Sequence, residues 1–437
     1  MRTLFRCLLT AAALAAMPLL ADSGHWWRGN THTHSWWSDG DAPPELIVDW
    51  YKSHGYHFLI LSDHNVMQQG EKWYAVDEPM RRPEAVRAAF EQYRERFGAD
   101  WVEVRGQPGE REVRLKTLSE FAPLFEEPGR FLLIAGEEIT DSHEHHPVHL
   151  NGMNLVEPVE PQGGDSVAAT IQHNLDAVLE QSRRHARPML AHLNHPNFHF
   201  AVTAEDFFEL EHDAGDGFFE MYNGHAGVHN NGDAERVSAE RLWDIVLANR
   251  LGVHGRSVIY GVATDDAHEY NSWGVGFTNP GRGWIMVRSA HLTPNAITAA
   301  LRHGDFYNST GVELRELRMD DGGIDLTVNE ETGVDYTVEF VGTRRGVELD
   351  PVAGPIVPEG DPAEPPRAFY RYGDAIGEVF ARVEGPHAHY RVRGDELYVR
   401  ARIISSRQHP NPFAVGDVEM AWTQPLVVAA GDGSGQP

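Results

Sequence analysis

The chain has 437 residues, with 65 acidic residues against 37 lysines and arginines. This length predicts a large globular protein of about two or three domains. Because acidic residues dominate and no run of lysines and arginines occurs, we expect no nucleic-acid partner.

The N-terminal segment is typical of an export signal. Arg2 and Arg6 precede an apolar stretch, Leu8–Leu20, and the small residue Ala21 suits cleavage. The stretch is shorter than a membrane span, and no later segment reaches about 18 apolar residues. We therefore expect residues 1–21 to be a signal peptide; an uncleaved anchor is the alternative. We also expect the protein to be periplasmic or secreted and to have no stable membrane span. Cleavage would also remove the only cysteine, which excludes cysteine catalysis and cysteine-ligated zinc.

The first chemical motif is the His-Thr-His-Ser run at residues 32–35. If a strand beginning near His25 continues through it, His32 and His34 point to the same side, because alternate strand residues share a face. Paired imidazoles are common ligands of zinc and similar ions, and the nearby Asp39 adds negative charge. For this motif alone, a chance His-X-His among 25 histidines is the alternative.

Short apolar runs then alternate with helical patterns. The expected strands are Tyr56–Leu61, Phe131–Ala135, Pro188–Leu193, Gly217–Met221, Ser257–Ala263 and Trp284–Val287, and the expected helices are Pro44–Ser53, Val167–His185 and Ala234–Asn249. This alternation favours a largely parallel sheet or a barrel. Catalytic groups gather at the carboxyl ends of barrel strands. Asp63-His64, Glu138, His195 and the 265–268 run follow such ends, which predicts a single site.

Two regions depart from this alternation of strands and helices. Residues 66–130, with a charged helix around Glu84–Phe97, are expected to be an insertion beside the site, either a lid or a peripheral decoration. After a helix from Thr293 through His303, apolar residues alternate with polar ones. We predict a separate all-β domain over residues 305–428, most simply a small sandwich, and a disordered tail over 429–437.

Taken together, the motifs resemble those of the PHP (polymerase and histidinol phosphatase) superfamily. The resemblance covers roughly residues 26–290 and rests on His32-Thr33-His34-Ser35, Asp39-Gly40, Asp63-His64, Glu138, His149, His195-Pro196 and Asp266-Ala267-His268, in this order. The phrase around Glu138 and the Ala421-Trp422-Thr423 ending are similar to the secreted carbaryl-hydrolase-like branch. The resemblance implies an α/β fold in which residues 22–304 form a distorted seven-stranded (β/α)7 barrel.

The resemblance also implies two or three divalent metal ions, zinc, manganese or iron. His32, His34 and Asp266 would hold one ion. Glu138 would bridge two ions, and His149 and His195 would complete the second position. Asp39, His64 and His268 would hold a third ion. Asp63 precedes a ligand and is expected to orient its neighbours, as carboxylates beside metal sites commonly do.

The chemistry expected of such a site is hydrolysis. A water shared between two cations loses a proton near neutral pH, and the metals hold a phosphoryl or carbonyl oxygen as charge develops. Asp266, Glu138 and His268 are the expected catalytic residues, with Asp266 either accepting the water proton or serving as a ligand alone. The residues flanking the ligands, which would contact a small-molecule ester substrate or pack structurally, are Asn65, Asn197, Tyr222 and Asn223.

The other histidines are assigned by position. His192 lies within an apolar run and is expected to be buried structure. His225 and His229 follow a strand end and are candidate substrate neighbours. His143, His145 and His146 precede His149 in a polar segment, which we interpret as a loop in which they either touch metal or substrate or are solvated.

We therefore expect an exported metal-dependent hydrolase, first of all a phosphoesterase. A carboxyl- or carbamate-ester hydrolase on the same metals is one alternative. A non-catalytic protein that binds a glycan or a partner is another, although the complete ligand set argues against it. The natural substrate, the metal and the oligomeric state stay open at this stage.

Overall fold

The computed structural model describes residues 24–356 and 368–429. The expected signal peptide, residues 1–21, and residues 430–437 of the expected tail lie outside this part of the chain. Within the described ranges, no helix combines the length and the apolar character that crossing a membrane requires.

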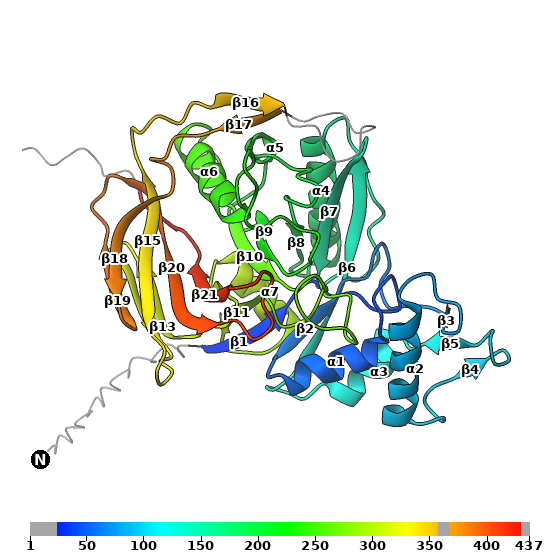
Figure 1. Cartoon of the computed structure of the whole chain (residues 1–437). Coiled ribbons are helices and arrows are strands. Elements are labelled where there is room, and N and C mark those ends of the chain that lie inside the picture. Colours follow the sequence, from blue (N-terminus) through cyan, green and yellow to red (C-terminus); the bar gives the residue numbers. More distant parts are fainter. Residues whose placement is uncertain (1–23, 357–367, 430–437) are drawn as a thin grey trace, which may run out of the picture.

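Most strands belong to one continuous hydrogen-bonded sheet (Figure 1). Its path runs β10-β9-β8-β7-β6-β2-β1-β11-β12 and then continues through β21-β20-β15-β18. The first nine of these strands are β1 (His25–Asn30), β2 (Phe58–Leu61), β6 (Leu132–His143), β7 (His146–Met153), β8 (Leu190–Leu193), β9 (Phe218–Asn223), β10 (Tyr260–Thr264), β11 (Trp284–Ser289) and β12 (Phe306–Ser309).

The N-terminal part of this sheet is rich in parallel pairs, as the strand–helix alternation predicted. Parallel ladders join β1 to β2, β2 to β6, β8 to β9 and β9 to β10. Two strands depart from this pattern: β7 runs antiparallel to both β6 and β8, and β11 runs antiparallel to both β1 and β12. Residues 143–149 are therefore not a loop. Only Glu144 and His145 separate the paired residues His143 and His146, and Glu144 takes the left-handed conformation that a tight turn requires.

The sheet curls so that β10 approaches β12. No ladder between these strands is recorded among the described residues, but side-chain amides link them. The side chain of Asn308 in β12 accepts from Ala263 N at 2.9 Å and donates to Gly261 O at 2.9 Å. Gln424 binds the N–H and C=O of Gly261 in the same two-bond manner. These amides satisfy backbone groups of β10 that a neighbouring strand would otherwise pair.

Five helices accompany these strands: α1 (Pro44–Ser53), α4 (Val167–His185), α5 (Ala204–Glu209), α6 (Ala239–Gly252) and α7 (Pro294–Arg302). The predicted bounds of α1 and α4 are confirmed. α6 begins five residues later than predicted, because the Ser238 side chain accepts from Arg241 N and caps the helix.

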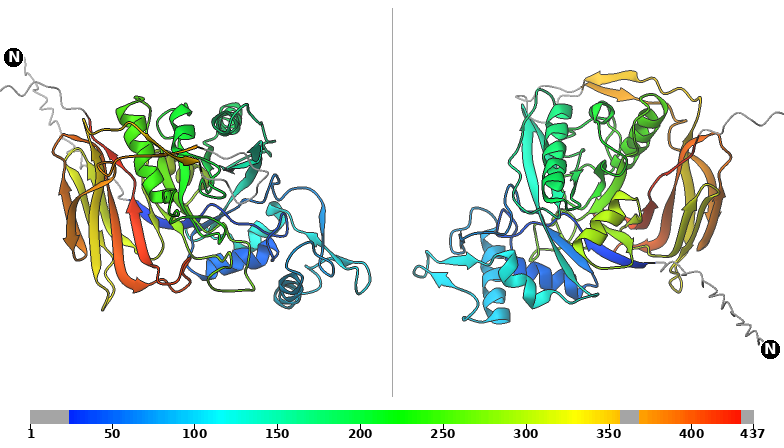
Figure 2. Two further views of the ribbon diagram at one scale, coloured as in Figure 1. Left: turned by 45° about the horizontal axis from the view of Figure 1, so that its top comes forward. Right: turned by 180° about the vertical axis from the view of Figure 1, so that it is seen from behind.

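The inserted segment is a small α/β unit. It holds a three-stranded antiparallel sheet of β3 (Lys72–Ala75), β5 (Glu112–Leu115) and β4 (Val104–Arg105), with α2 (Pro83–Phe97) and α3 (Leu118–Phe125). Figure 2 shows this unit at one edge of the molecule and the C-terminal sheets at the other. Its helix α2 shares a buried cluster with the central sheet, and Tyr93 in α2 donates to Glu45 in α1 at 2.5 Å.

The C-terminal strands form antiparallel sheets. The large sheet continues through β21 (Val418–Thr423), β20 (Glu396–Gln408), β15 (Tyr336–Arg344) and β18 (Glu378–Glu384), and β22 (Leu426–Val427) pairs with β20. A second sheet contains β13 (Leu314–Asp320), β14 (Gly323–Val328) and β19 (His387–Arg391). A third sheet contains β16 (Val352–Ile356) and β17 (Ala368–Arg371). Ile324 and Leu326 of β14 share a buried cluster with Val338 and Phe340 of β15.

Strand pairing and a buried ion pair join this region to the N-terminal part. β12 pairs with β11 on one side and with β21 on the other. Arg400 in β20 is fully buried and binds Asp244 and Glu240 of α6 at 2.8 Å each. The predicted boundary between residues 304 and 305 stays a prediction, and continuous hydrogen bonding runs across the sheet beyond it.

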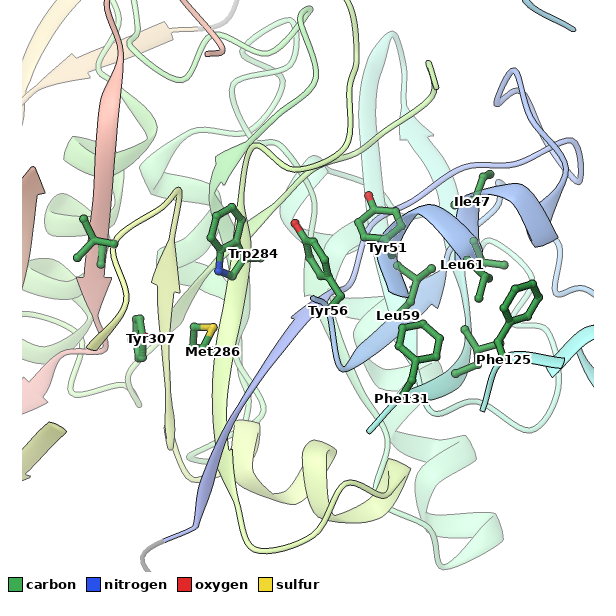
Figure 3. Close-up of a cluster of buried hydrophobic side chains, with 14 of the residues drawn as sticks. Ile47, Tyr51, Tyr56, Leu59, Leu61, Phe125, Phe131, Trp284, Met286 and Tyr307 are labelled. Carbon is green, nitrogen blue, oxygen red and sulfur yellow. The ribbon is translucent and has the colours of Figure 1, made fainter. Parts of the chain in front are cut away.

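Figure 3 shows part of the hydrophobic core that supports the site. Side chains from α1, β2, α3 and β11 meet there, and Tyr51 of α1 and Trp284 of β11 are both buried. The Tyr51 hydroxyl donates to Asp265 Oδ2 at 2.8 Å. Because Asp265 directly precedes Asp266, this core contact fixes the end of β10 where a predicted ligand lies.

Candidate metal centre

His32 and His34 point to one place, although not from within a strand. β1 ends at Asn30, and its side chain accepts from His32 N at 2.9 Å. The chain stays extended beyond this point because Thr33 forms a parallel bridge with Ala267. The Nε2 atoms of His32 and His34 lie 3.1 Å apart, and both side chains are fully buried. The predicted convergence of the two rings is therefore present.

The structure brings all nine predicted metal ligands together. They form four overlapping groups, in each of which the ligand atoms lie within 4.8 Å of one another. The groups are His34, Asp39, His64 and His268; His32, His34 and Glu138; His32, His195 and Asp266; and His64, Glu138 and His149.

The grouping differs in part from the one that the family resemblance implied. His195 lies with His32 and Asp266, whereas His149 lies with His64 and Glu138. His149 and His195 still face each other, with ring centroids 5.1 Å apart. The third set expected from the resemblance is present and also includes His34.

Glu138 has the geometry of a bridging carboxylate. Its Oε1 accepts from His149 Nδ1 at 3.0 Å and lies 3.5 Å from the Nε2 atoms of His32 and His195. Its Oε2 faces the other way, 3.4 Å from His34 Nε2 and 2.7 Å from His64 Nδ1. Each oxygen therefore faces a different set of imidazoles.

Asp266 occupies the end of β10 on a strained backbone. Its Oδ1 lies 3.2 Å from the Nε2 atoms of both His32 and His34. Its φ of 48° is left-handed, and His195 and Asn65 share this property with φ values of 24° and 50°. Such conformations cost about 1–3 kcal/mol each and gather at functional sites.

The third set of residues depends on a tight loop. Gly40 N donates to Ser35 O at 3.0 Å, and a Cβ on Gly40 would lie only 2.4 Å from His34 O. The loop thereby places Asp39 Oδ1 3.1 Å from His268 Nε2. His268 Nδ1 donates to Asp266 O at 2.9 Å, which leaves Nε2 without a proton in the neutral ring and directed toward Asp39.

These residues fit a divalent metal centre. Asp39 Oδ1, Glu138 Oε2 and Asp266 Oδ1 are buried and lack a hydrogen-bond donor of suitable geometry. Leaving a buried carboxylate oxygen unpaired is costly, and a cation would satisfy all three. Histidine and carboxylate donors without cysteine suit zinc, manganese or iron.

The electrostatics of the cluster favour cations. Burial opposes ionisation of Glu138, but His64, His149 and His32 hold its pKa well below the usual range. Burial would lower the pKa of His64, yet Glu138 and Asp39 raise it to about 9. By contrast, burial and the neighbouring His268 and His64 lower the pKa of His34 to about 3. Protons on some of these imidazoles thus balance the carboxylates.

Sequence reasoning missed the residues that orient the ligands. Glu220 Oε1 accepts from His32 Nδ1 at 2.7 Å, and its Oε2 accepts from His195 N at 2.7 Å. Asn194 donates to Glu138 Oε1 at 2.8 Å. The one signal that the sequence offers for Glu220 is a carboxylate inside the predicted apolar strand Gly217–Met221.

The predicted orienting role of Asp63 is present in the contacts. Asp63 Oδ1 accepts from Ser35 N at 2.8 Å and from Ser38 Oγ at 2.6 Å, and Oδ2 accepts from Gln68 at 2.8 Å. Asp63 therefore holds the loop between His34 and Asp39 and does not belong to any ligand group.

The four predicted substrate residues make contacts within the protein. Asn65 exchanges two hydrogen bonds with the Thr140 backbone, and Asn197 donates to His229 O and Val237 O. The centroid of the Tyr222 ring lies 6.2 Å from that of Trp422. Asn223 donates to Glu220 and Asp266. Their contact with substrate stays a prediction.

The remaining histidines differ in their distance from the cluster and in their contacts. His192 is buried, and its Nε2 lies 3.1 Å from Thr31 Oγ1, consistent with a structural role. The His225 ring lies 5.3 Å from that of His268, and its Nδ1 accepts from Gly227 N. His229 stacks on Phe200 at 4.8 Å. His225 is therefore the one of the two expected substrate neighbours that borders the cluster.

Comparisons with known proteins find only distant likenesses. No protein-family model matches the sequence, and no curated protein matches it. One similar solved structure, from Bacteroides vulgatus, is a two-domain protein described as containing a predicted PHP-like metal-dependent phosphoesterase. It is 14% identical, with 93% of this chain and 96% of that chain covered and a TM-score of 0.36.

A second similar structure, from Bifidobacterium adolescentis, belongs to a protein whose description assigns it as a metal-dependent phosphoesterase. It is 14% identical, with 58% of this chain and 92% of that chain covered and a TM-score of 0.27.

Proposed function

We propose that the chain is an exported metal-dependent hydrolase of PHP type, a phosphoesterase acting on a small-molecule ester. One observation carries this proposal: three buried carboxylate oxygens, on Asp39, Glu138 and Asp266, face imidazole nitrogens without a hydrogen-bond donor. Such an arrangement is costly in a binding module and useful in a metal hydrolase. Export to the periplasm or the medium is part of the proposal and rests on the N-terminal residues alone.

Two or three ions of zinc, manganese or iron would be held by the nine residues of the four groups. Such ions, when bound, would supply a water of lowered pKa and positive charge for the ester oxygens. We also propose that the curled sheet is the distorted seven-stranded barrel of this superfamily, that the C-terminal sheets form a sandwich, and that the chain falls in the carbaryl-hydrolase-like branch.

The chain's own residues prepare this chemistry. Glu220 accepts from His32 Nδ1 and so directs His32 Nε2 into the cluster. The two oxygens of Glu138 each face a different set of imidazoles. In the proposed reaction, the Asp266 carboxylate accepts a proton from the attacking water, and Asn223 orients it by donating to Oδ2 at 3.1 Å. Burial of these groups excludes bulk water and strengthens every charge interaction.

Metal content is the first test of this function. Protein purified without chelator should carry at least about two equivalents of transition metal, because one cation takes only about four to six ligands. A chelator should abolish activity, and added metal should restore it. Less than about half an equivalent of metal, with no hydrolysis, would instead favour a glycan- or partner-binding protein.

Substrate class is the second test. Hydrolysis of phosphomonoesters, phosphodiesters and aryl carboxyl esters should be compared in wild type and in Asp39→Asn. The substitution should slow phosphoester cleavage more than any carboxyl-ester cleavage, because a phosphoryl transition state spreads charge over three oxygens and uses the third cation. A wild type active only on carboxyl or carbamate esters would replace the phosphoesterase proposal with that alternative.

A further inference from the structure

The cluster opens to solvent on one side. Most of its side chains are nearly fully buried, but His64 and Asp39 keep exposed fractions of 30% and 19%. Both belong to the group that also contains His34 and His268. A substrate therefore reaches the candidate metal centre past Asp39 and His64.

The inserted unit places two adjacent arginines at this opening. Arg81 Nη1 donates to Asp39 Oδ2 at 2.5 Å. Asp39 thus faces the cluster with Oδ1 and the inserted unit with Oδ2. The guanidinium lies one carboxylate away from the predicted third metal position.

The two arginines differ in how much of their bonding capacity is used. Arg82 donates to Asp39 O at 2.9 Å and to Glu269 at 3.1 Å, and Glu269 is itself held by Thr278. Arg82 also caps α2 in a left-handed conformation, with φ of 48°. Arg81 makes one contact with the site and keeps 64% of its side chain exposed. Arg82 therefore fastens the segment, whereas most N–H groups of Arg81 stay available.

We propose that Arg81 binds a non-bridging oxygen of the substrate's phosphoryl group and makes the site selective for phosphomonoesters. This inference rests on the proposed function and names its substrate class. A guanidinium binds phosphate through two parallel N–H donors, and such charge-assisted bonds are strong. A phosphomonoester carries more negative charge than a diester, and a carboxyl ester carries none at its reacting group. In a chain of net charge −28, this local cation is what an anionic substrate would need.

Binding of inorganic phosphate to the metal-loaded full chain gives a test without turnover. Arg81→Ala should weaken phosphate binding by about 10- to 100-fold, the usual effect of losing a charged hydrogen-bond partner. Arg81→Lys should restore only part of the affinity, because it keeps the charge but lacks the planar fork. Arg94→Ala is the matched control, since Arg94 lies on α2 of the same unit and pairs with Glu91 at 3.9 Å. Unchanged phosphate affinity in fully loaded Arg81→Ala protein would overturn the proposal.

Metal analysis separates substrate binding from a role in holding Asp39. If Arg81→Ala loses metal while its loaded fraction binds phosphate as wild type does, Arg81 merely positions Asp39 and the proposal is wrong. Turnover adds a second readout: Arg81→Ala should raise KM for p-nitrophenyl phosphate and reduce the preference over bis(p-nitrophenyl) phosphate. A wild type that binds phosphate through Arg81 but cleaves no phosphoester would leave this anion site standing and refute the proposed function instead.

Discussion

His32 Nδ1 donates to Glu220 Oε1 at 2.7 Å, and both side chains are fully buried. The contact keeps a proton on His32 Nδ1 and directs Nε2 into the cluster, so that Nε2 is the ring nitrogen that would bind a metal. Burial would raise the pKa of Glu220, but His32 and His192 lower it to about 2, so Glu220 stays ionised at neutral pH. Glu220 thus controls a candidate ligand without entering any ligand group.

We expect Glu220→Gln to lower metal affinity by about 10- to 100-fold, the usual cost of losing a carboxylate that orients a metal-bound imidazole. The amide also presents N–H donors to His195 N, which is itself a donor. Metal competition with a fluorescent chelator measures the change. Glu211→Gln, at a carboxylate 72% exposed, is the control and should behave as wild type. Equal affinities in both variants would remove Glu220 from the site.

The neighbouring carboxylates Glu138 and Glu137 should respond in opposite ways. Glu138→Gln removes the charge shared by two imidazole sets and should cut turnover by about 100-fold or more, as loss of a transition-state electrostatic group commonly does. Glu137 faces away, accepting from Val159 N at 2.5 Å, and burial raises its pKa to about 7. Glu137→Gln keeps the acceptor and should be mild. Metal content and kcat measure both; the reverse ranking would show that the wrong carboxylate serves the centre.

Metal uptake should release protons. In the metal-free protein, Glu138 raises the pKa of His64 to about 9, so this imidazole is protonated at pH 7. A metal binds only neutral imidazole, and uptake below pH 9 must therefore displace this proton. Carboxylates also raise the pKa of His32 and of His268, so affinity should rise steadily with pH from 7 to 9. His34, with a pKa near 3, contributes no proton in this range.

Calorimetric metal titration in buffers of different ionisation enthalpy counts these protons. His64→Asn should release about one proton fewer than wild type at pH 7, since it removes one titrating ligand. A binding enthalpy that is the same in every buffer would contradict the prediction.

The ion pair between Arg400 and Asp244 should contribute strongly to stability. Both groups are buried, and Tyr398 also donates to Asp244 at 2.8 Å. Arg400→Met would leave Asp244 as an uncompensated buried charge, which costs about 3–5 kcal/mol. Arg382→Met removes an arginine that is 59% exposed and should cost less than about 1 kcal/mol. Urea unfolding of the two variants tests the contrast, and equal losses would argue against it.

The sequence predicted the members of the site better than their arrangement. Asp266 follows the end of β10, and Glu138 follows the part of β6 that pairs in parallel with β2, which ends at Ala135, so both could be placed together from the apolar strand pattern. Helix ends with clear caps, such as Ser166 before α4, were also placed correctly. Which imidazole faces which carboxylate depends on ring orientation, and no spacing rule encodes it.

Contacts between distant segments were beyond the sequence. Glu220 and His32 are 188 residues apart, and Arg81 and Asp39 belong to different structural units 42 residues apart. The prediction of a loop before His149 is wrong because polar histidines cover a segment that forms the hairpin of β6 and β7. Polar side chains are compatible with a strand when one face lines a charged cluster, as His149 does here.

The pairing of β12 on both sides has a consequence for how the chain can be divided. A fragment ending after Ser309 would leave the outer backbone groups of β12 unpaired, together with the apolar surface that β21 covers. Open edges of this kind recruit other chains. This N-terminal fragment expressed alone should therefore associate with itself, because the strand that covers the edge of β12 in the full chain would be missing.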